Sequence, residues 1–301
     1  MNILITGAGG FLGKRLTSLL AKSNHQVFAI LRKPISSVDS HYFKSKRITP
    51  IIQDLETLDT AILPKKIDAM FTLAQSSNFR NFPLGAEEIF EINTVSNLKL
   101  LNWALNSGVR RIIHASSGGV YGGSKGDLKH TLAETDQLET NKPLGFYLGT
   151  KLCSEIIFQN YAHLFDSMSI LRPFFIYGPR QRDDMFIARL IKSIKSGSPI
   201  TLQGEHGLRV NPIYVDDAAI AFQAALSIEG SNIFNVAGEE TLTLKSISEK
   251  IGKELNTQPK FINLPGQPSD YIGSTALSDK NLIFTKTPFD IGIQITCSHF
   301  V

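Results

Sequence analysis

The chain has 301 residues, a formal net charge of +4, and 42% hydrophobic against 19% charged residues. These values are typical of a soluble globular protein with one large domain or two smaller ones. No apolar run approaches the roughly 20 residues that span a bilayer, and no basic stripe points to nucleic acid, so we expect neither partner. Two cysteines are too few for a disulfide framework, and the first strand leaves no room for a signal peptide, so we expect a cytoplasmic protein.

A glycine-rich turn separates the first predicted strand, Asn2–Thr6, from a predicted helix over Phe11–Lys22. Gly7 permits the tight turn, Gly10 lets the backbone approach a pyrophosphate, and Gly13 lets helix and strand pack closely. The N–H groups and the dipole at the helix N-terminus favour an anion there. The turn therefore predicts a dinucleotide-binding site formed by Gly7, Gly10, Phe11, Leu12 and Gly13.

The second predicted strand, Gln26–Leu31, ends without the acidic residue that hydrogen-bonds the ribose of NAD. Arg32 follows instead, and its guanidinium can grip the 2′-phosphate of NADP. We therefore favour NADP over NAD as the cofactor, with a solvated loop as the alternative role of Arg32. After the third predicted strand, Ile48–Gln53, the residues Asp54 and Leu55 can contact the adenine, although an aspartate here is also an ordinary turn residue.

The rest of the first half continues the alternation of strands and helices. Strands are predicted at Ala69–Leu73, Arg111–Ser116 and Met168–Leu171, and helices at Ala86–Ser107 and Phe146–Leu164. This pattern predicts an α/β fold, a Rossmann-type doubly wound parallel sheet that binds ligands at the carboxyl ends of its strands.

Frequent prolines break up the pattern after residue 172. We expect residues 1–172 to form an NAD(P)-binding Rossmann domain, to which a segment of about 211–227 returns. Residues 173–301 are expected to form mainly a smaller C-terminal substrate-binding lobe.

Tyr147 and Lys151 lie four residues apart at the start of a predicted helix, and therefore on one helical face. A lysine ammonium so placed is expected to lower the pKa of the phenol and to make Tyr147 usable as an acid or base. Ser116 ends the fifth predicted strand and Ser117 follows it, at a place where a serine hydroxyl can hydrogen-bond a carbonyl or alcohol oxygen and hold it toward Tyr147. No residue is assigned to a metal.

These motifs occur in an order that resembles the extended short-chain dehydrogenase/reductase family, in its nucleotide-sugar epimerase/dehydratase branch. The likeness covers nearly the whole chain. It rests on Thr6-Gly7-xx-Gly10-Phe11-Leu12-Gly13, Leu73-Ala74, Asn93, Ser116-Ser117-xx-Val120-Tyr121-Gly122, Tyr147-xxx-Lys151, Arg172-Pro173, Tyr177-Gly178-Pro179-Arg180 and Val215-Asp216-Asp217.

The resemblance implies hydride transfer between a nicotinamide and a sugar carbon, with Ser117, Tyr147 and Lys151 as catalytic residues and Ser116 as the substitute for Ser117. Cofactor-binding residues are then Leu73, Ala74, Asn93, Tyr147 and Lys151. Asn93 resembles the family's asparagine that supports the lysine through water, although a polar residue on a helix surface is an equal alternative.

For the substrate, the resemblance implies a nucleotide sugar. Arg209 stands where relatives place an arginine on the substrate pyrophosphate, and Arg180 is a further cation near the cleft. The resemblance also implies a homodimer, formed through the helices that contain residues 86–107 and 146–164.

The chain departs from the family at three places. Gly118 and Gly119 stand where dehydratases of this branch carry an Asp–Glu pair, so dehydration is not expected. Phe175 replaces an asparagine of many epimerases. Gln75 and Ser76 replace small apolar residues or histidine, and can either hydrogen-bond sugar hydroxyls or line the cofactor.

Three functions remain after this comparison. The favoured one is an NADPH-dependent reductase of a 4-keto nucleotide sugar, with Tyr147 as proton donor. The alternative is a nucleotide-sugar 4-epimerase with tightly bound NAD, which uses the same residues. The third is a non-catalytic NADP-binding protein, which the intact Tyr147–Lys151 pair disfavours.

Overall fold

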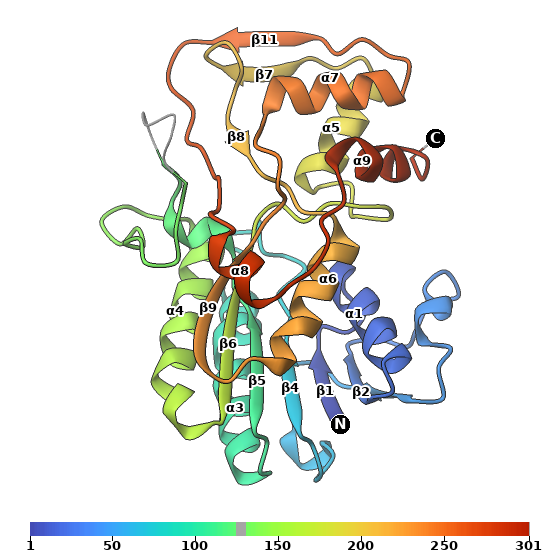
Figure 1. The fold of residues 1–301 in the computed structure, drawn as a ribbon, viewed down its shortest axis with the longest axis vertical. Helices are drawn as coiled ribbons and strands as arrows, with labels where there is room; N and C mark the ends of the chain where they lie inside the picture. The colour runs from blue at the N-terminus through green and yellow to red at the C-terminus, as the bar shows by residue number, and fades with distance from the viewer. Residues whose placement is uncertain (125–130, 301) are drawn as a thin grey trace. The chain divides into compact units, whose positions relative to one another are not determined.

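The computed structural model describes residues 1–124 and 131–300. The chain divides into two compact units, each built from three segments (Figure 1). The first unit comprises Met1–Val120, Glu139–Arg172 and Ala219–Phe234, and the second comprises Tyr121–Leu138, Pro173–Ala218 and Asn235–Val301. The segment of the second half that joins the first unit overlaps the predicted 211–227 and begins later.

A seven-stranded sheet forms the centre of the first unit, with strand order β3-β2-β1-β4-β5-β6-β9. The pairs from β3 to β6 are all parallel. The strand order reverses between β1 and β4, which confirms the predicted Rossmann-type doubly wound sheet. The strands are β1 (Asn2–Thr6), β2 (Gln26–Leu31), β3 (Ile48–Ile52), β4 (Ala69–Thr72), β5 (Arg111–Ala115), β6 (Ser167–Pro173) and β9 (Gly230–Val236).

Helices cover the sheet because its central strands are apolar on both sides. In β1, for example, Leu4 packs with the cluster beneath α3 (Ser96–Asn106) and α4 (Phe146–Tyr161), which includes Leu101 and Phe158. The neighbours of Leu4 along the strand are equally buried on the opposite side. There α1 (Phe11–Lys22) packs along β1 and β2, and a hydrogen bond joins its end to α6 (Val215–Ala224).

One predicted helix is interrupted. Ala86–Ser107 is divided into α2 (Ala86–Phe90), a π-helical turn (Glu91–Val95) and α3. Such turns are rare and frequently occur at functional sites. The other long predicted helix ends at Tyr161 and continues as a 3₁₀ turn over Ala162–Leu164. Strand β9 was not predicted.

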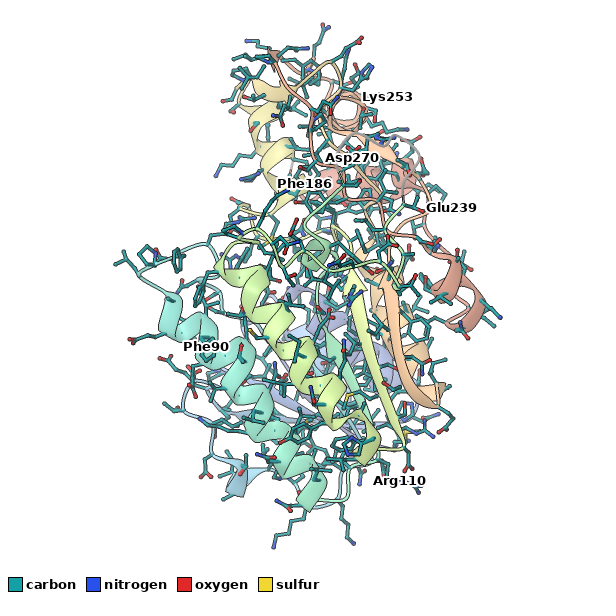
Figure 2. All side chains as sticks on the ribbon, turned by 90° about the vertical axis from the view of Figure 1, so that its left-hand side faces the viewer. Phe90, Arg110, Phe186, Glu239, Lys253 and Asp270 are labelled. Carbon is teal, nitrogen blue, oxygen red and sulfur yellow. The ribbon has the colours of Figure 1, made fainter. Side chains whose placement is uncertain are left out.

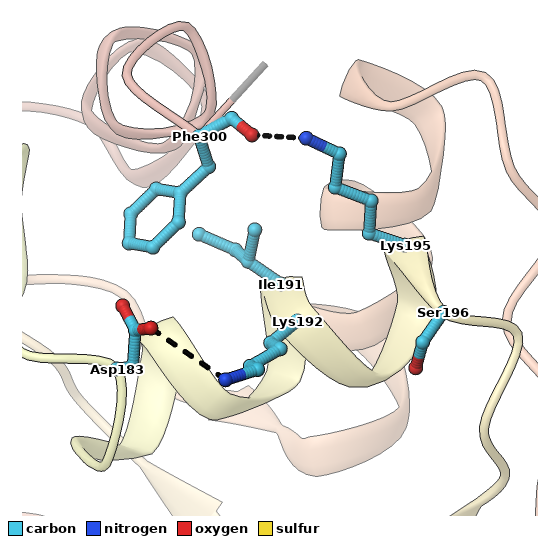
Figure 3. Close-up of a pocket in the computed structure, with 6 residues that line it drawn as sticks. All are labelled: Asp183, Ile191, Lys192, Lys195, Ser196 and Phe300. Carbon is cyan, nitrogen blue, oxygen red and sulfur yellow. Dashed lines mark hydrogen bonds and ion pairs between the residues drawn. The ribbon is translucent and has the colours of Figure 1, made fainter.

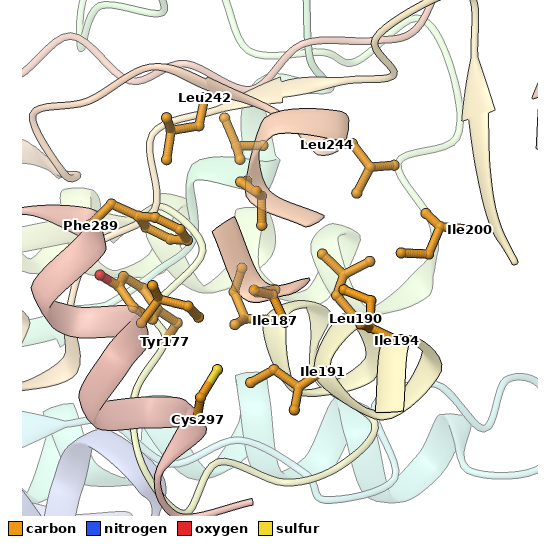
Figure 4. Packing of buried hydrophobic residues seen from close by; sticks show 14 of the residues in the cluster. Tyr177, Ile187, Leu190, Ile191, Ile194, Ile200, Leu242, Leu244, Phe289 and Cys297 are labelled. Atoms are coloured by element: carbon orange, nitrogen blue, oxygen red, sulfur yellow. The ribbon is translucent and has the colours of Figure 1, made fainter. Parts of the chain in front are cut away.

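The second unit contains short strands and helices around its own apolar core (Figure 4). Residues such as Ile187, Ile191, Leu244, Phe289 and Cys297 meet there. β11 pairs parallel with β7, and β10 pairs antiparallel with β8. The elements are α5 (Phe186–Lys195), β7 (Ile200–Gln203), β8 (Arg209–Val210), β10 (Leu242–Thr243), α7 (Leu244–Glu254), β11 (Phe261–Leu264), α8 (Ala276–Asn281) and α9 (Phe289–Cys297).

Across residues 1–124 and 131–300, none of the helices has both the length and the apolar character needed to cross a membrane.

Candidate active site

The glycine-rich turn brings the end of β1 against the end of β4. Gly7 has a φ of +69°, and a Cβ atom there would lie 2.7 Å from the backbone nitrogen of Ala74. A Cβ atom on Gly13 would overlap the carbonyl oxygen of Gly7. Only glycine therefore allows this turn, the loop after β4 and the first turn of α1 to lie so close together.

The first turn of α1 offers its N–H groups to a ligand. Its N-cap residue is Gly10, which has no side chain to accept a hydrogen bond from them, and the first turn carries no acidic residue. An N-terminus of this kind fits an anionic pyrophosphate. Gly7, Gly10, Phe11, Leu12 and Gly13 are thus in a suitable place to hold a dinucleotide, with Leu73 and Ala74 beside them.

The residues predicted to select the cofactor follow the other strands. Arg32 is exposed, and its two terminal nitrogens each lie 3.3 Å from the hydroxyl oxygen of Ser77 in the loop after β4. Asp54 accepts a hydrogen bond from the backbone nitrogen of Glu56, so its carboxylate closes a local turn. Leu55 is buried in the core.

Tyr147 and Lys151 lie one turn apart at the start of α4, as predicted, but they face different partners. The Tyr147 hydroxyl donates a hydrogen bond to Oε1 of Gln75, at 2.8 Å. The Lys151 ammonium is buried and donates to the carbonyl oxygen of Ala115, the last residue of β5, at 2.9 Å. The loop after β4, the end of β5 and the first turns of α4 therefore meet at this point.

The predicted lowering of the phenol pKa is wrong for this arrangement. Burial raises the pKa of Tyr147, because it penalises the charged phenolate. Burial also lowers the pKa of Lys151 to about 8, and the nearby Glu155 carboxylate opposes that shift. No charged side chain offsets this burial at the phenol, since the ammonium is directed at the Ala115 carbonyl and the phenol at the neutral amide of Gln75.

Glu155 is a site residue that the sequence analysis missed. Its two carboxylate oxygens accept hydrogen bonds from Nε and a terminal nitrogen of Arg172, at 2.9 and 2.7 Å. Both side chains are at most 2% exposed, so the carboxylate needs this two-pronged partner to be tolerated. Its position four residues after Lys151 on α4 was the available signal.

The two predicted serines differ in their surroundings. The Ser117 hydroxyl oxygen accepts a hydrogen bond from the backbone nitrogen of Gly119, at 3.1 Å. The Ser116 hydroxyl is buried and lacks a hydrogen-bond partner within the described part of the chain. A Cβ atom on Gly119 would lie 2.6 Å from a methyl group of Leu148 on α4, so this loop packs against the helix through a glycine.

Asn93 lies in the π-helical turn and is completely buried. Its Oδ1 accepts from the backbone nitrogen of Ser76 at 3.2 Å, and its Nδ2 donates to the Thr150 hydroxyl at 3.0 Å. Asn93 therefore ties the loop after β4 to α4. Burial excludes the alternative of a polar surface residue.

The two predicted substrate arginines belong to the second unit. Arg209 pairs with Asp270, which accepts from its backbone nitrogen at 2.8 Å and from its guanidinium at 2.7 Å; Asp270 is labelled in Figure 2. Sequence spacing gave no signal for this partner, which lies 61 residues away. Arg180 is exposed and has a φ of +64°. Phe175 packs its ring against Phe186.

The second unit also has a cavity of about 300 Å³ along α5 (Figure 3). Lys192 and Lys195 on its wall are paired with Asp183 and the carbonyl oxygen of Phe300, respectively. The lining includes none of the predicted site residues. Within the ranges described above, no group of three or more His, Cys, Asp or Glu side chains could hold a metal ion.

Residues 3–237 match the model of the NAD dependent epimerase/dehydratase family. The chain belongs to this family. It is an enzyme family, and the match confirms the resemblance noted from the motifs.

Individual relatives agree with this membership. The chain is 29% identical to an uncharacterized UDP-glucose epimerase, YtcB, of Bacillus subtilis, over 90% of this chain and 88% of that protein. It is 26% identical to the UDP-glucuronate 4-epimerase of Thermodesulfobacterium geofontis, over 85% of this chain and 81% of the relative. The structure of UDP-glucuronic acid 4-epimerase from Bacillus cereus with UDP-glucuronic acid and NAD has a TM-score of 0.85 and 26% identity, covering 99% of this chain and 98% of that one.

Burial of the Lys151 ammonium makes stability depend on pH. Because the pKa falls from 10.5 to about 8 on folding, the charge destabilises the folded state fully below pH 8, and this penalty disappears as the pH rises from about 8 to 10.5. Lys151→Met is therefore expected to raise the free energy of unfolding at pH 7 by roughly 3 kcal/mol. The gain should shrink by pH 10.

Urea unfolding at pH 7, 8.5 and 10 measures this gain. Lys99→Met removes a lysine of α3 whose side chain is 43% exposed and serves as the control. If the gain in the free energy of unfolding from Lys151→Met stays constant across the three pH values, the lowered pKa of Lys151 is contradicted.

Proposed function

We propose that the protein is a 4-epimerase of UDP-sugars that works with bound NAD. The observation that carries the proposal is the placement of Tyr147 and Lys151 on the first turns of α4, with the Tyr147 hydroxyl on Gln75 in the loop after β4 and the Lys151 ammonium on Ala115 at the end of β5. The relatives named above, which are called UDP-glucose or UDP-glucuronate epimerases, support this reaction over the reductase that the sequence alone favoured.

Under this proposal bound NAD would supply the hydride chemistry at the sugar carbon. Tyr147 takes the proton of the sugar hydroxyl during oxidation and gives it back during reduction, while Ser117 or Ser116 holds the oxygen. Because burial raises the pKa of Tyr147, the residue is protonated at neutral pH. That is the form which the reductive half of the reaction uses, whereas the oxidative half uses the phenolate.

The dinucleotide cofactor is assigned to residues of the first unit, and the substrate phosphates are assigned to residues of the second unit. Gly7, Gly10, Phe11, Leu12, Gly13, Leu73 and Ala74 would hold the dinucleotide. Arg209, held in place by Asp270, is proposed for the substrate pyrophosphate, and Arg180 for a supporting contact.

Tyr147→Phe is expected to lower kcat at least about a hundredfold, because the ring loses the proton that the reaction moves. NAD binding should change little. Conversion of UDP-glucuronate and UDP-glucose to their 4-epimers, followed by chromatography, provides the measurement. Tyr161→Phe is the control on the same helix, since the Tyr161 hydroxyl donates to Asn102 instead. Full activity of Tyr147→Phe would overturn the proposed role.

A second candidate is the NADPH-dependent reductase of a 4-keto nucleotide sugar. Arg32, in place of an acidic residue after β2, specifically favours it, because a guanidinium suits a 2′-phosphate. If this candidate is right, the purified protein consumes exchangeable NADPH with a keto-sugar. If the epimerase is right, NAD stays with the protein through gel filtration.

Arg32→Ala tests the cofactor directly. Should the guanidinium bind a 2′-phosphate, the variant weakens NADPH at least about tenfold and NADH hardly at all, as expected for a lost charge-assisted hydrogen bond. Lys66→Ala, which removes a positive charge just before β4, controls for net charge. Equal effects of Arg32→Ala on the two nucleotides would leave NAD as the cofactor.

Association of two copies through α2, α3 and α4 is also proposed. Phe90, Leu98 and Ile156 on these helices are 43%, 37% and 52% exposed, whereas Leu101 is in the core. Phe90 is labelled in Figure 2. Sedimentation should give twice the chain mass of 33.2 kDa, and Ile156→Asp should halve it. A monomer at micromolar concentration would contradict this interface.

A further inference from the structure

Gln75 is the hydrogen-bond partner of the proposed acid–base residue. It lies in the loop after β4, and its Oε1 accepts from the Tyr147 hydroxyl at 2.8 Å, a normal distance for such a bond. Gln75 stands where the family typically has a small apolar residue or a histidine. An alanine at this position could make no such bond.

The charged groups on the elements around the phenol are directed elsewhere. Lys151 on α4 donates to Ala115, and His114 on β5 has a pKa lowered well below its ordinary value by burial and by the Lys151 charge. In the loop after β4, the Ser76 hydroxyl and the Asn78 side-chain amide both donate to the carboxylate of Glu88 on α2. Arg32 donates to Ser77, and Arg80 lies over the ring of Phe79, which in turn contacts the Tyr147 ring. The phenol oxygen is thus paired with a neutral amide.

A side-chain amide suits both protonation states of a tyrosine. Its carbonyl oxygen accepts from the O–H of the phenol, and its NH₂ group can donate to the oxygen of a phenolate. A half-turn of the terminal amide exchanges one for the other without moving the rest of the side chain. A carboxylate of the same size can only accept, and a thioether can do neither well.

We infer that Gln75 is a positioning residue that holds Tyr147 through its proton cycle. The amide carbonyl accepts from the phenol while the proton is on Tyr147, and the amide NH₂ donates to the phenolate after that proton has passed to the substrate oxygen. The phenolic O–H bond breaks, an O–H bond forms on the substrate, and Gln75 itself gains and loses nothing. This inference rests on the proposed acid–base role of Tyr147.

Two substitutions separate this role from a merely structural one. Gln75→Glu keeps the size but places a negative charge beside the phenolate, so the rise of kcat/KM with pH should shift upward by about one unit. Its kcat at pH 7.5 should fall about tenfold, the scale of a lost hydrogen bond to a charged group. Gln75→Met should lower kcat by a similar factor, with KM within about twofold and a smaller pH shift.

The pH profile is measured between pH 6 and 10 with the same UDP-sugar as above. Gln223→Glu makes the same chemical change on α6, where Gln223 donates to Ser23, and should leave the profile unmoved. Thermal melting of each variant shows whether it is folded.

The outcomes distinguish the two proposals. If Tyr147→Phe remains active, the proposed function fails. If Tyr147→Phe is inactive while Gln75→Glu and Gln75→Met keep both kcat and the pH profile, only the role of Gln75 is overturned. A loss of kcat in both Gln75 variants with an unshifted profile would also overturn it, since that result indicates a structural role alone.

Discussion

A lysine ammonium buried at the end of β5 is the interaction on which the rest of the predicted site depends. Taking such a charge out of water costs several kcal/mol. The carbonyl oxygen of Ala115 and the field of the Glu155 carboxylate offset part of this cost. Glu155 is itself buried and committed to Arg172, so the three charges on α4 and β6 leave one net positive charge, that of Lys151. The part of the desolvation cost that is not offset appears as the lowered pKa of Lys151. The hydrogen bond to Ala115 holds the amine where the end of β5 meets the start of α4.

Neutral polar groups then position the phenol beside this charge. The loop after β4 reaches α4 at two successive residues, because Gln75 accepts from Tyr147 and the backbone of Ser76 donates to Asn93, which holds Thr150. The same loop passes against Gly7 of the dinucleotide-binding turn through Ala74. A single loop therefore links the proposed cofactor turn with the proposed acid–base residue. A displacement of the dinucleotide-binding turn would therefore be transmitted through this loop to Tyr147.

Local patterns were sufficient to predict the elements that carry most of this arrangement. The bounds of β1, α1 and β2 match the prediction, because apolar runs and glycine punctuation define them without reference to the rest of the chain. The π-helical turn could not be predicted in this way, because it depends on contacts between distant parts of the chain. It places Asn93 between Ser76 in the loop after β4 and Thr150 on α4. Strand β9 contains two asparagines, which strands disfavour. Gln75 and Tyr147 are separated by 72 residues, so their contact exists only in the folded chain.

The glycines after Ser117 limit the chemistry as well as the packing. The family's dehydratases carry acids where this chain has Gly118 and Gly119, and a side chain at Gly119 would collide with Leu148. Regaining an acid there would require α4 or its leucine to move, next to Tyr147 itself. The loop is thus built to lie against the helix and not to present a carboxylate to the sugar. Under the proposed function, the described residues of this site therefore move one proton, the phenolic proton of Tyr147. Gln75 is exposed, but as the hydrogen-bond partner of that hydroxyl it bears directly on this proton transfer.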